Sequence, residues 1–113
     1  MVEHRQSLRK PPDRPIDVLD VITGRPIGRV GNLSIDGMLL ITQRALPVNA
    51  LYQLSFNLPS ASGSGTRPLE IGVNEQWGER AAAPGQFWTG FHIIDISPED
   101  QDRLTAWVNS DHG

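Results

Sequence analysis

Cysteine is absent from this chain of 113 residues, which excludes a disulfide framework and any metal site built on thiolates. No apolar run approaches the roughly 20 residues that span a bilayer, and no signal-peptide pattern opens the chain. Aromatic residues make up only 6% and the net charge is −3, whereas general nucleic-acid binding requires a basic excess. We therefore expect a cytoplasmic globular protein that binds neither membranes nor nucleic acids.

Arginine is the unusual component, because it supplies nine of the ten basic residues. Residues 1–14 contain four basic and two acidic residues, and residues 95–113 contain five acidic residues and one basic residue. The guanidinium group offers a planar fork of donors that suits phosphate and the edge of guanine. This distribution is compatible with a small anionic ligand near the amino end and does not favour a large polyanion.

Short extended segments separated by turn residues follow one another through most of the chain, which is typical of a small antiparallel barrel or sandwich. The clearest strand pattern alternates apolar and polar residues between Tyr52 and Leu58. The expected strands are Ile16–Ile22, Arg25–Leu33, Gly37–Thr42, Tyr52–Leu58, Leu69–Trp77 and Phe87–Ile96. The Gly/Ser-rich segment 60–66 and Glu79–Gln86 are expected to be loops.

The two ends of the chain differ from this pattern. Residues 1–15 are polar, contain three prolines and are expected to form a flexible arm. Ser97–Asp100 has the features of a helix start, and Leu104, Trp107 and Val108 then fall on one face. The sequence predicts a single domain, residues 1–113, comprising an arm (1–15), a β-barrel (16–96) and a closing helix (97–109).

Two short motifs contain the residues of greatest chemical interest. Arg5 and Arg9 are four residues apart, a spacing that random order would produce about 0.6 times in this chain. The string Asn32-Leu-Ser-Ile-Asp-Gly37 fits an Asn/Asp-x-Ser-x-x-Gly pattern, which chance would produce roughly 0.1 times. Arg25 and Arg29 repeat the arginine spacing, but inside an expected strand, where we interpret them as a solvated barrel surface.

An arginine pair before the first strand, followed by Asn-x-Ser-x-x-Gly at a strand–turn–strand junction, resembles the paired signature of the PilZ domain. PilZ domains are bacterial receptor modules for cyclic di-GMP. The resemblance covers nearly the whole chain and implies a small six-stranded antiparallel β-barrel with a flexible N-terminal arm and one C-terminal helix. The ligand-binding residues that it implies are Arg5, Arg9, Asn32, Ser34 and Gly37.

These residue types match the chemistry of that ligand, a dianion with two guanines. Arg5 and Arg9 can each form bidentate, charge-assisted bonds to phosphate or to guanine O6 and N7. Asn32 offers a donor and an acceptor to a guanine edge, and Ser34 a hydroxyl to base or ribose. Gly37 is expected to permit a positive-φ turn and close ligand approach. The alternative is an ordinary hairpin in which the last three residues only set the turn.

Three further residues are candidates for secondary ligand contacts. His4 stands where many members of the family carry a third arginine, and Lys10 could supply a phosphate contact in its place. Trp77 is at the position where some relatives stack a tryptophan on guanine, although a core or rim role is an equal alternative. Trp88 and Trp107 are expected to be core and helix-packing residues.

No catalytic or metal-binding constellation is recognised, because the histidines lack ligand spacing and Ser34 lacks the sequence context of a nucleophile. The resemblance implies a non-enzymatic receptor, without a cofactor, that relays cyclic di-GMP binding through its arm to an unidentified protein partner. The alternative is a PilZ-like interaction adaptor, as in type IV pilus assembly, that does not bind the nucleotide. Whether the protein is a monomer or a homodimer stays open.

Overall fold

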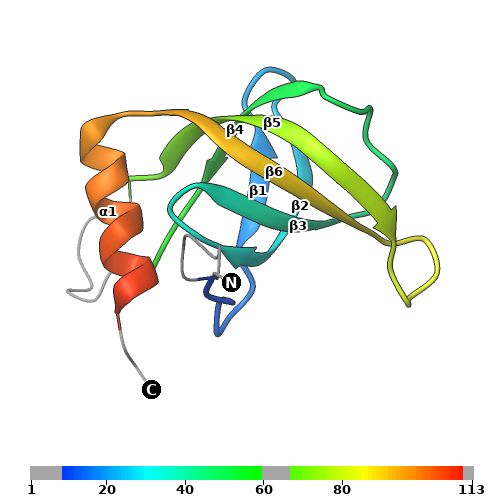
Figure 1. Cartoon of the computed structure of the whole chain (residues 1–113), viewed down its shortest axis with the longest axis horizontal. Coiled ribbons are helices and arrows are strands. Elements are labelled where there is room, and N and C mark those ends of the chain that lie inside the picture. Colours follow the sequence, from blue (N-terminus) through cyan, green and yellow to red (C-terminus); the bar gives the residue numbers. More distant parts are fainter. Residues whose placement is uncertain (1–8, 60–66, 111–113) are drawn as a thin grey trace, which may run out of the picture.

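A computed structural model describes residues 9–59 and 67–110 of the chain. Six strands and one helix follow one another in sequence (Figure 1). Their bounds are β1 Asp17–Asp20, β2 Arg25–Leu33, β3 Gly37–Thr42, β4 Leu51–Phe56, β5 Leu69–Arg80, β6 Phe87–Ile96 and α1 Pro98–Asn109. The candidate ligand-binding residues His4 and Arg5, and the expected loop 60–66, lie outside the described residues.

The strands pair in the order β1-β2-β3-β6-β5-β4 and close into a barrel in which all neighbours are antiparallel. Successive side chains alternate between the interior and the outer face of the barrel. In β3, Met38, Leu40 and Thr42 are buried, whereas Leu39 and Ile41 between them are half-buried on the outer face. The six-stranded antiparallel barrel with one C-terminal helix, predicted from the sequence, is confirmed.

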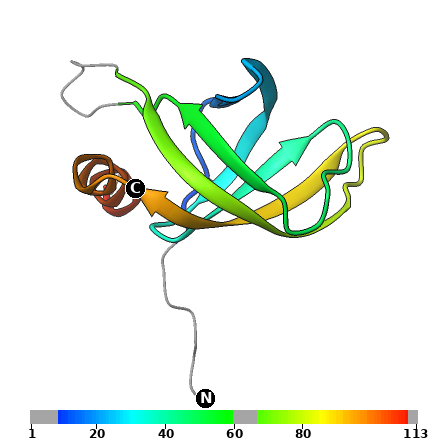
Figure 2. The ribbon, with the colours of Figure 1, turned by 90° about the horizontal axis from the view of Figure 1, so that it is seen from above.

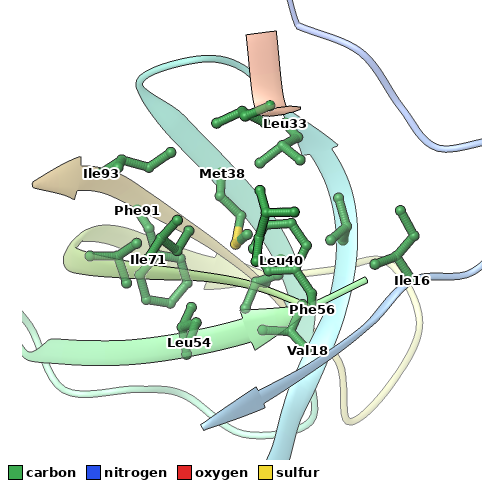
Figure 3. Packing of buried hydrophobic residues seen from close by; sticks show 14 of the residues in the cluster. Ile16, Val18, Leu33, Met38, Leu40, Leu54, Phe56, Ile71, Phe91 and Ile93 are labelled. Carbon is green, nitrogen blue, oxygen red and sulfur yellow. The ribbon is translucent and has the colours of Figure 1, made fainter. Parts of the chain in front are cut away.

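The core fills the barrel with aliphatic and aromatic side chains contributed by every strand (Figure 3). Leu33, Leu40 and Leu54 are 0% exposed. Tyr52 packs edge-to-face on Phe91, with ring centroids 5.9 Å apart. Burial raises the pKa of the Tyr52 phenol above its ordinary value, and nearby Asp20 and Glu75 add to the effect while Arg44 opposes it.

Helix α1 closes one end of the molecule, and the β5–β6 hairpin projects from the other (Figures 1 and 2). The side chain of Ser97 accepts a hydrogen bond from the Asp100 amide, and Pro98 begins the helix. Leu104 and Val108 are buried against the barrel core. The helix start and its apolar face are as predicted.

Asp100, a residue that is only 4% exposed, fixes the start of α1 to the barrel. Its oxygens accept hydrogen bonds from the Arg67 and Arg103 guanidinium groups at 3.3 and 3.2 Å, and from the Glu70 amide at 3.3 Å. Both oxygens of the buried carboxylate therefore have hydrogen-bond donors. No helix within the described residues is long and apolar enough to cross a membrane.

Three strands differ from their predicted bounds. β4 is Leu51–Phe56, whereas Tyr52–Leu58 was expected. β1 ends at Asp20, because the Asp20 carboxylate accepts hydrogen bonds from the amides of Ile22 and Thr23 and begins a turn there. β5 continues to Arg80, three residues beyond its expected end, because its last residues pair with the beginning of β6. The loop predicted from residue 79 is therefore shorter, and it lies between β5 and β6.

The inner part of the expected arm is docked on the barrel. Lys10 and Leu33 exchange two backbone hydrogen bonds, of 3.0 and 3.1 Å. The Lys10 ammonium group donates to the Trp107 carbonyl at 2.9 Å and to the Ser110 hydroxyl at 2.6 Å, and lies 4.4 Å from the Trp107 ring centroid. Arg9 and Lys10, at the inner end of the expected arm, therefore lie beside β2 and α1, a placement that the sequence alone could not predict.

Candidate functional site

One row of residues crosses the outer face of four neighbouring strands. Asn32 of β2 is opposite Leu39 of β3, Leu39 is opposite Gly90 of β6, and Gly90 is opposite Trp77 of β5. Residues that share a row of a sheet lie side by side, although 58 positions separate Asn32 from Gly90 in the sequence. The register thus brings the Asn32 motif and Trp77 to the same face.

A cavity of about 530 Å³ opens over this row. Its polar side chains come from the arm, β2, the β2–β3 turn, β5 and β6, and they are those of Arg9, Asn32, Asp36, Gln76 and His92. Trp77 of β5 adds an exposed aromatic ring. The β2–β3 turn lies on the same side of the barrel as α1 (Figure 1). An open cavity with convergent polar groups and one exposed aromatic ring can accept a polar ligand.

The Arg9 guanidinium group reaches the cavity because the next residue, Lys10, pairs with the end of β2. Its NH1 donates a hydrogen bond of 2.9 Å to the Asn32 side-chain oxygen. A guanidinium group has five donors and Asn32 retains its two amide hydrogens, so both side chains keep donors for an anion or a base. The first and second sequence motifs are therefore in contact through these two residues.

Ser34 is 1% exposed and uses its hydroxyl group inside the β2–β3 turn. The hydroxyl oxygen accepts a hydrogen bond from the Gly37 amide at 3.0 Å and the hydroxyl donates to an Asp36 carboxylate oxygen at 2.8 Å. This is the geometry of a side chain that holds a turn. Ser34 shapes the rim of the cavity and positions Asp36, and its hydroxyl is not presented at the cavity surface.

Gly37 is required for a different reason from the one expected. Among the described glycines, positive φ occurs at Gly24 and Gly85 and not at Gly37, so the predicted positive-φ turn is wrong. Instead, a Cβ atom on Gly37 would lie 3.1 Å from the Phe91 carbonyl oxygen of the neighbouring strand. The missing side chain allows β3 and β6 to approach closely and leaves the floor of the cavity open beside His92, the partner of Gly37 in the register.

Trp77 is 48% exposed, and its indole lies against Gly90 on the outer face. A Cβ atom on Gly90 would come within 2.6 Å of the indole Cε2 atom, so the absence of a side chain there sets the position of the ring. This excludes a core position for Trp77, one of the two roles left open by the sequence. Its exposed face lines the same cavity as Arg9 and Asn32.

Trp88 is not the core residue that the sequence predicted. It is half-buried on the outer face, opposite Ile41 and Glu79, and covers Gly31. Strand parity places it there, because Thr89 and Phe91 face inward. Trp107 is half-buried against the core and against Lys10, as expected of a helix-packing residue.

The remaining sequence candidates are divided between the site and other parts of the molecule. Arg5 and His4 lie outside the described residues, so their contacts remain predictions. The ammonium group of Lys10 is directed to the end of α1 and not to the cavity. Arg25 and Arg29 are exposed on β2, as predicted, and Arg29 Nε lies 3.7 Å from the Asp17 carboxylate.

Three polar residues of the cavity were missed by the sequence reasoning: Asp36, Gln76 and His92. Asp36 lies inside the second motif, but at a position that the motif leaves undefined. Gln76 and His92 enter the cavity through strand register, and the register near Gln76 shifts at a bulge between Glu75 and Trp77. Within residues 9–59 and 67–110, no group of three or more His, Asp or Glu side chains could hold a metal ion.

No family model and no curated protein matches the sequence. Solved structures do match its fold. The Bacillus subtilis inhibitor of motility, MotI/DgrA, matches with a TM-score of 0.77 at 17% identity over 95% of this chain and 50% of that protein. Escherichia coli YcgR in complex with c-di-GMP matches with a TM-score of 0.69 at 15% identity, over 91% of this chain and 43% of YcgR.

The PilZ domain of YcgR with c-di-GMP also matches, with a TM-score of 0.63 at 14% identity over 90% of this chain and 86% of that domain. The barrel and its C-terminal helix therefore have the PilZ fold, which confirms the fold implied by the two motifs. The chain spans half or less of the length of MotI/DgrA and of the longer YcgR chain.

Proposed function

We propose that this protein is a non-enzymatic receptor for cyclic di-GMP. The single observation that carries the proposal is the 2.9 Å contact between Arg9 and Asn32, at the edge of a cavity that also contains an exposed tryptophan. Two motifs that are separate in the sequence thus meet at one site. The PilZ fold supports the proposal, because two of the matching structures contain c-di-GMP.

The chemistry of the cavity matches the parts of that ligand. Arg9 provides charge-assisted donors for a phosphate or for the O6 and N7 atoms of guanine. Asn32 can bond a base edge with its amide group, and the exposed face of Trp77 can stack on a purine. Arg5, four residues before Arg9, would approach the same ligand from the arm.

Lys10 suggests how binding could reach a partner protein. Arg9 faces the cavity, whereas the next side chain, Lys10, bonds the last turn of α1. A ligand that pulls on Arg9 would therefore change the position of Lys10 and the fit of α1 on the barrel. This is a ligand-driven shift between two arrangements of the arm and helix, and it provides a changed surface for an unidentified partner.

Isothermal titration calorimetry tests the proposal with the wild type and two arginine variants. We expect cyclic di-GMP to bind the wild type with a Kd of about 1 μM or tighter, near −8 kcal/mol. Arg9→Ala removes charge-assisted hydrogen bonds worth about 1.5–3 kcal/mol each, so affinity should fall at least about tenfold. Arg25→Ala makes the same change at an exposed arginine outside this cavity and should bind as the wild type does.

The second candidate function is a PilZ-like adaptor that binds a protein and not the nucleotide. The Asp36 carboxylate favours it, because an anion at the rim of the cavity opposes a dianionic ligand. An adaptor would give no heat with cyclic di-GMP and no change in its amide NMR spectrum. That result would reject the receptor and leave the adaptor.

A further inference from the structure

The charges around the cavity are not those of a simple phosphate site. Among the described residues, its ionisable side chains are Arg9 from the arm, Asp36 from the β2–β3 turn and His92 from β6. With a neutral imidazole, the positive charge of Arg9 is cancelled by the negative charge of Asp36. An anion in a site for a dianion is unfavourable unless it makes a specific bond that offsets the repulsion.

Asp36 is held in a defined orientation at this rim. Its Oδ1 atom accepts a hydrogen bond of 2.8 Å from the Ser34 hydroxyl, and its backbone carbonyl accepts one of 2.9 Å from the Ile93 amide. Its Oδ2 atom makes no hydrogen bond to the described residues, and no arginine or lysine among them pairs with it. The carboxylate is thus fixed at one oxygen and has an acceptor available at the other.

We propose that Asp36 reads a guanine base in this cavity and makes the site selective for guanine over adenine. The inference rests on the proposed function and extends it to a residue that neither sequence motif defines. The Watson–Crick edge of guanine carries two neighbouring donors, N1–H and the N2 amino group. A carboxylate accepts from both, and these bonds are charge-assisted.

Adenine gives the opposite pattern at the same edge. Its N1 atom is an acceptor, and it has no amino group at C2. An adenine placed in the same position would direct a lone pair at the Asp36 carboxylate, which is repulsive. The carboxylate therefore disfavours the wrong base as well as favouring the right one, and such a difference in two affinities is what specificity requires.

Trp77 and Asp36 would divide the recognition of one base between them. The indole lies against Gly90 and is about half exposed, and its exposed surface can take part in stacking, which every base can use. Gly37 adds no side chain beside the β2–β3 turn, and the indole covers Gly90. Stacking then supplies affinity without selectivity, and the carboxylate at the rim supplies the selectivity.

The test compares cyclic di-GMP with cyclic di-AMP in calorimetric titrations of three proteins: wild type, Asp36→Asn and Asp95→Asn. Asp36→Asn retains an oxygen that can accept from Ser34, and circular dichroism checks that it folds. Asp95→Asn makes the same change of charge on β6 at an exposed position outside the cavity. The proposal predicts that wild type and Asp95→Asn bind cyclic di-GMP at least about tenfold tighter than cyclic di-AMP, as one charged hydrogen bond allows.

In Asp36→Asn, the affinity for cyclic di-GMP should fall at least about tenfold and the preference over cyclic di-AMP should shrink. If Asp36 only supports the turn, Asp36→Asn would keep the wild-type preference for cyclic di-GMP. It would bind both dinucleotides as tightly as the wild type or more tightly. That result would overturn the inference and leave the receptor intact. A wild type that binds neither dinucleotide would instead overturn the proposed function, and the inference with it.

A measurement on the wild type provides a check that does not depend on a variant. A guanine N1–H proton bonded to a carboxylate exchanges slowly with water and gives a low-field imino signal in the NMR spectrum of the complex. The proposal predicts this signal for bound cyclic di-GMP. Saturated binding without a protected imino proton would show that no carboxylate holds the guanine edge, and would overturn the inference.

Discussion

Gly90→Ala is a small change that should move the Trp77 indole out of the site. The added Cβ atom would come within 2.6 Å of the indole Cε2 atom, closer than two non-bonded carbon atoms approach each other. The neighbouring backbone is held in the β3–β6–β5 register, whereas Trp77 is 48% exposed and can turn toward solvent. We therefore expect the side chain to move and the strands to stay.

The effect on stability can be estimated from the covered part of the indole. About half of the tryptophan side chain, roughly 100 Å², would become exposed to water, which corresponds to a loss of at most about 2.5 kcal/mol in the free energy of unfolding. The alanine recovers about 0.4–1 kcal/mol by restricting the unfolded chain. The free energy of unfolding should thus fall by about 1–2 kcal/mol, measured by urea denaturation.

Gly90→Ala should also weaken ligand binding. Stacking of a base on an aromatic side chain contributes about 1–3 kcal/mol, so loss of the platform should weaken cyclic di-GMP binding by roughly 5- to 150-fold. Gly31→Ala is a matched control, because its Cβ atom would lie 2.8 Å from Cζ3 of Trp88, which does not line the cavity. It should displace Trp88 and leave affinity unchanged.

The indole N–H signal of Trp77 in the NMR spectrum shows whether the ring has moved. If the signal shifts in Gly90→Ala and affinity equals that of the wild type, Trp77 does not stack on the ligand. If the signal does not shift, the steric argument is itself wrong. Either result refutes the reasoning at a different step.

Three further predictions concern the parts of the fold that support the site. Lys10→Met should lower the free energy of unfolding by about 1–2 kcal/mol and speed amide exchange in the last turn of α1, because it removes hydrogen bonds to Trp107 and Ser110. Asp100→Ala should cost about 3–5 kcal/mol in urea denaturation, since it leaves buried donors unpaired, whereas exposed Asp102→Ala should change stability by less than about 0.5 kcal/mol. Tyr52 is the one tyrosine, so the absorbance titration of the folded protein should have a midpoint above 10.0. Because the pKa of Tyr52 is higher in the folded than in the unfolded protein, the free energy of unfolding should fall as pH rises from the unfolded to the folded pKa. This fall should be smaller in Tyr52→Phe.

Much of the fold could be predicted from the sequence because its signals are local. The bounds of β2, β3 and β6 were predicted to the residue, because turn residues and changes in periodicity mark both ends of each strand. The helix start at Ser97 depends only on its own capping residue and the acids that follow. The identity of the barrel also followed, because a short motif at a fixed place in the strand order carries that information.

The missed features all depend on which strands are neighbours and in which register. Trp88 was assigned to the core from its residue type, whereas its exposure follows from the parity of β6. His92 enters the site because it pairs with Gly37, which lies 55 positions earlier. The role of Gly37 likewise depends on the Phe91 carbonyl of a strand that is distant in sequence. Long-range pairing of this kind leaves no local pattern.

The most direct test of the central claim is an amide NMR titration of the ¹⁵N-labelled protein with cyclic di-GMP. The account predicts shift changes at Asn32, Gly37, Gly90 and His92 and at the Trp77 indole, because these groups line one cavity. Resonances of residues on the opposite strands β1 and β4 should stay in place. Saturable changes centred on any other face would contradict the proposed site, and an unchanged spectrum at saturating ligand would contradict the receptor function itself.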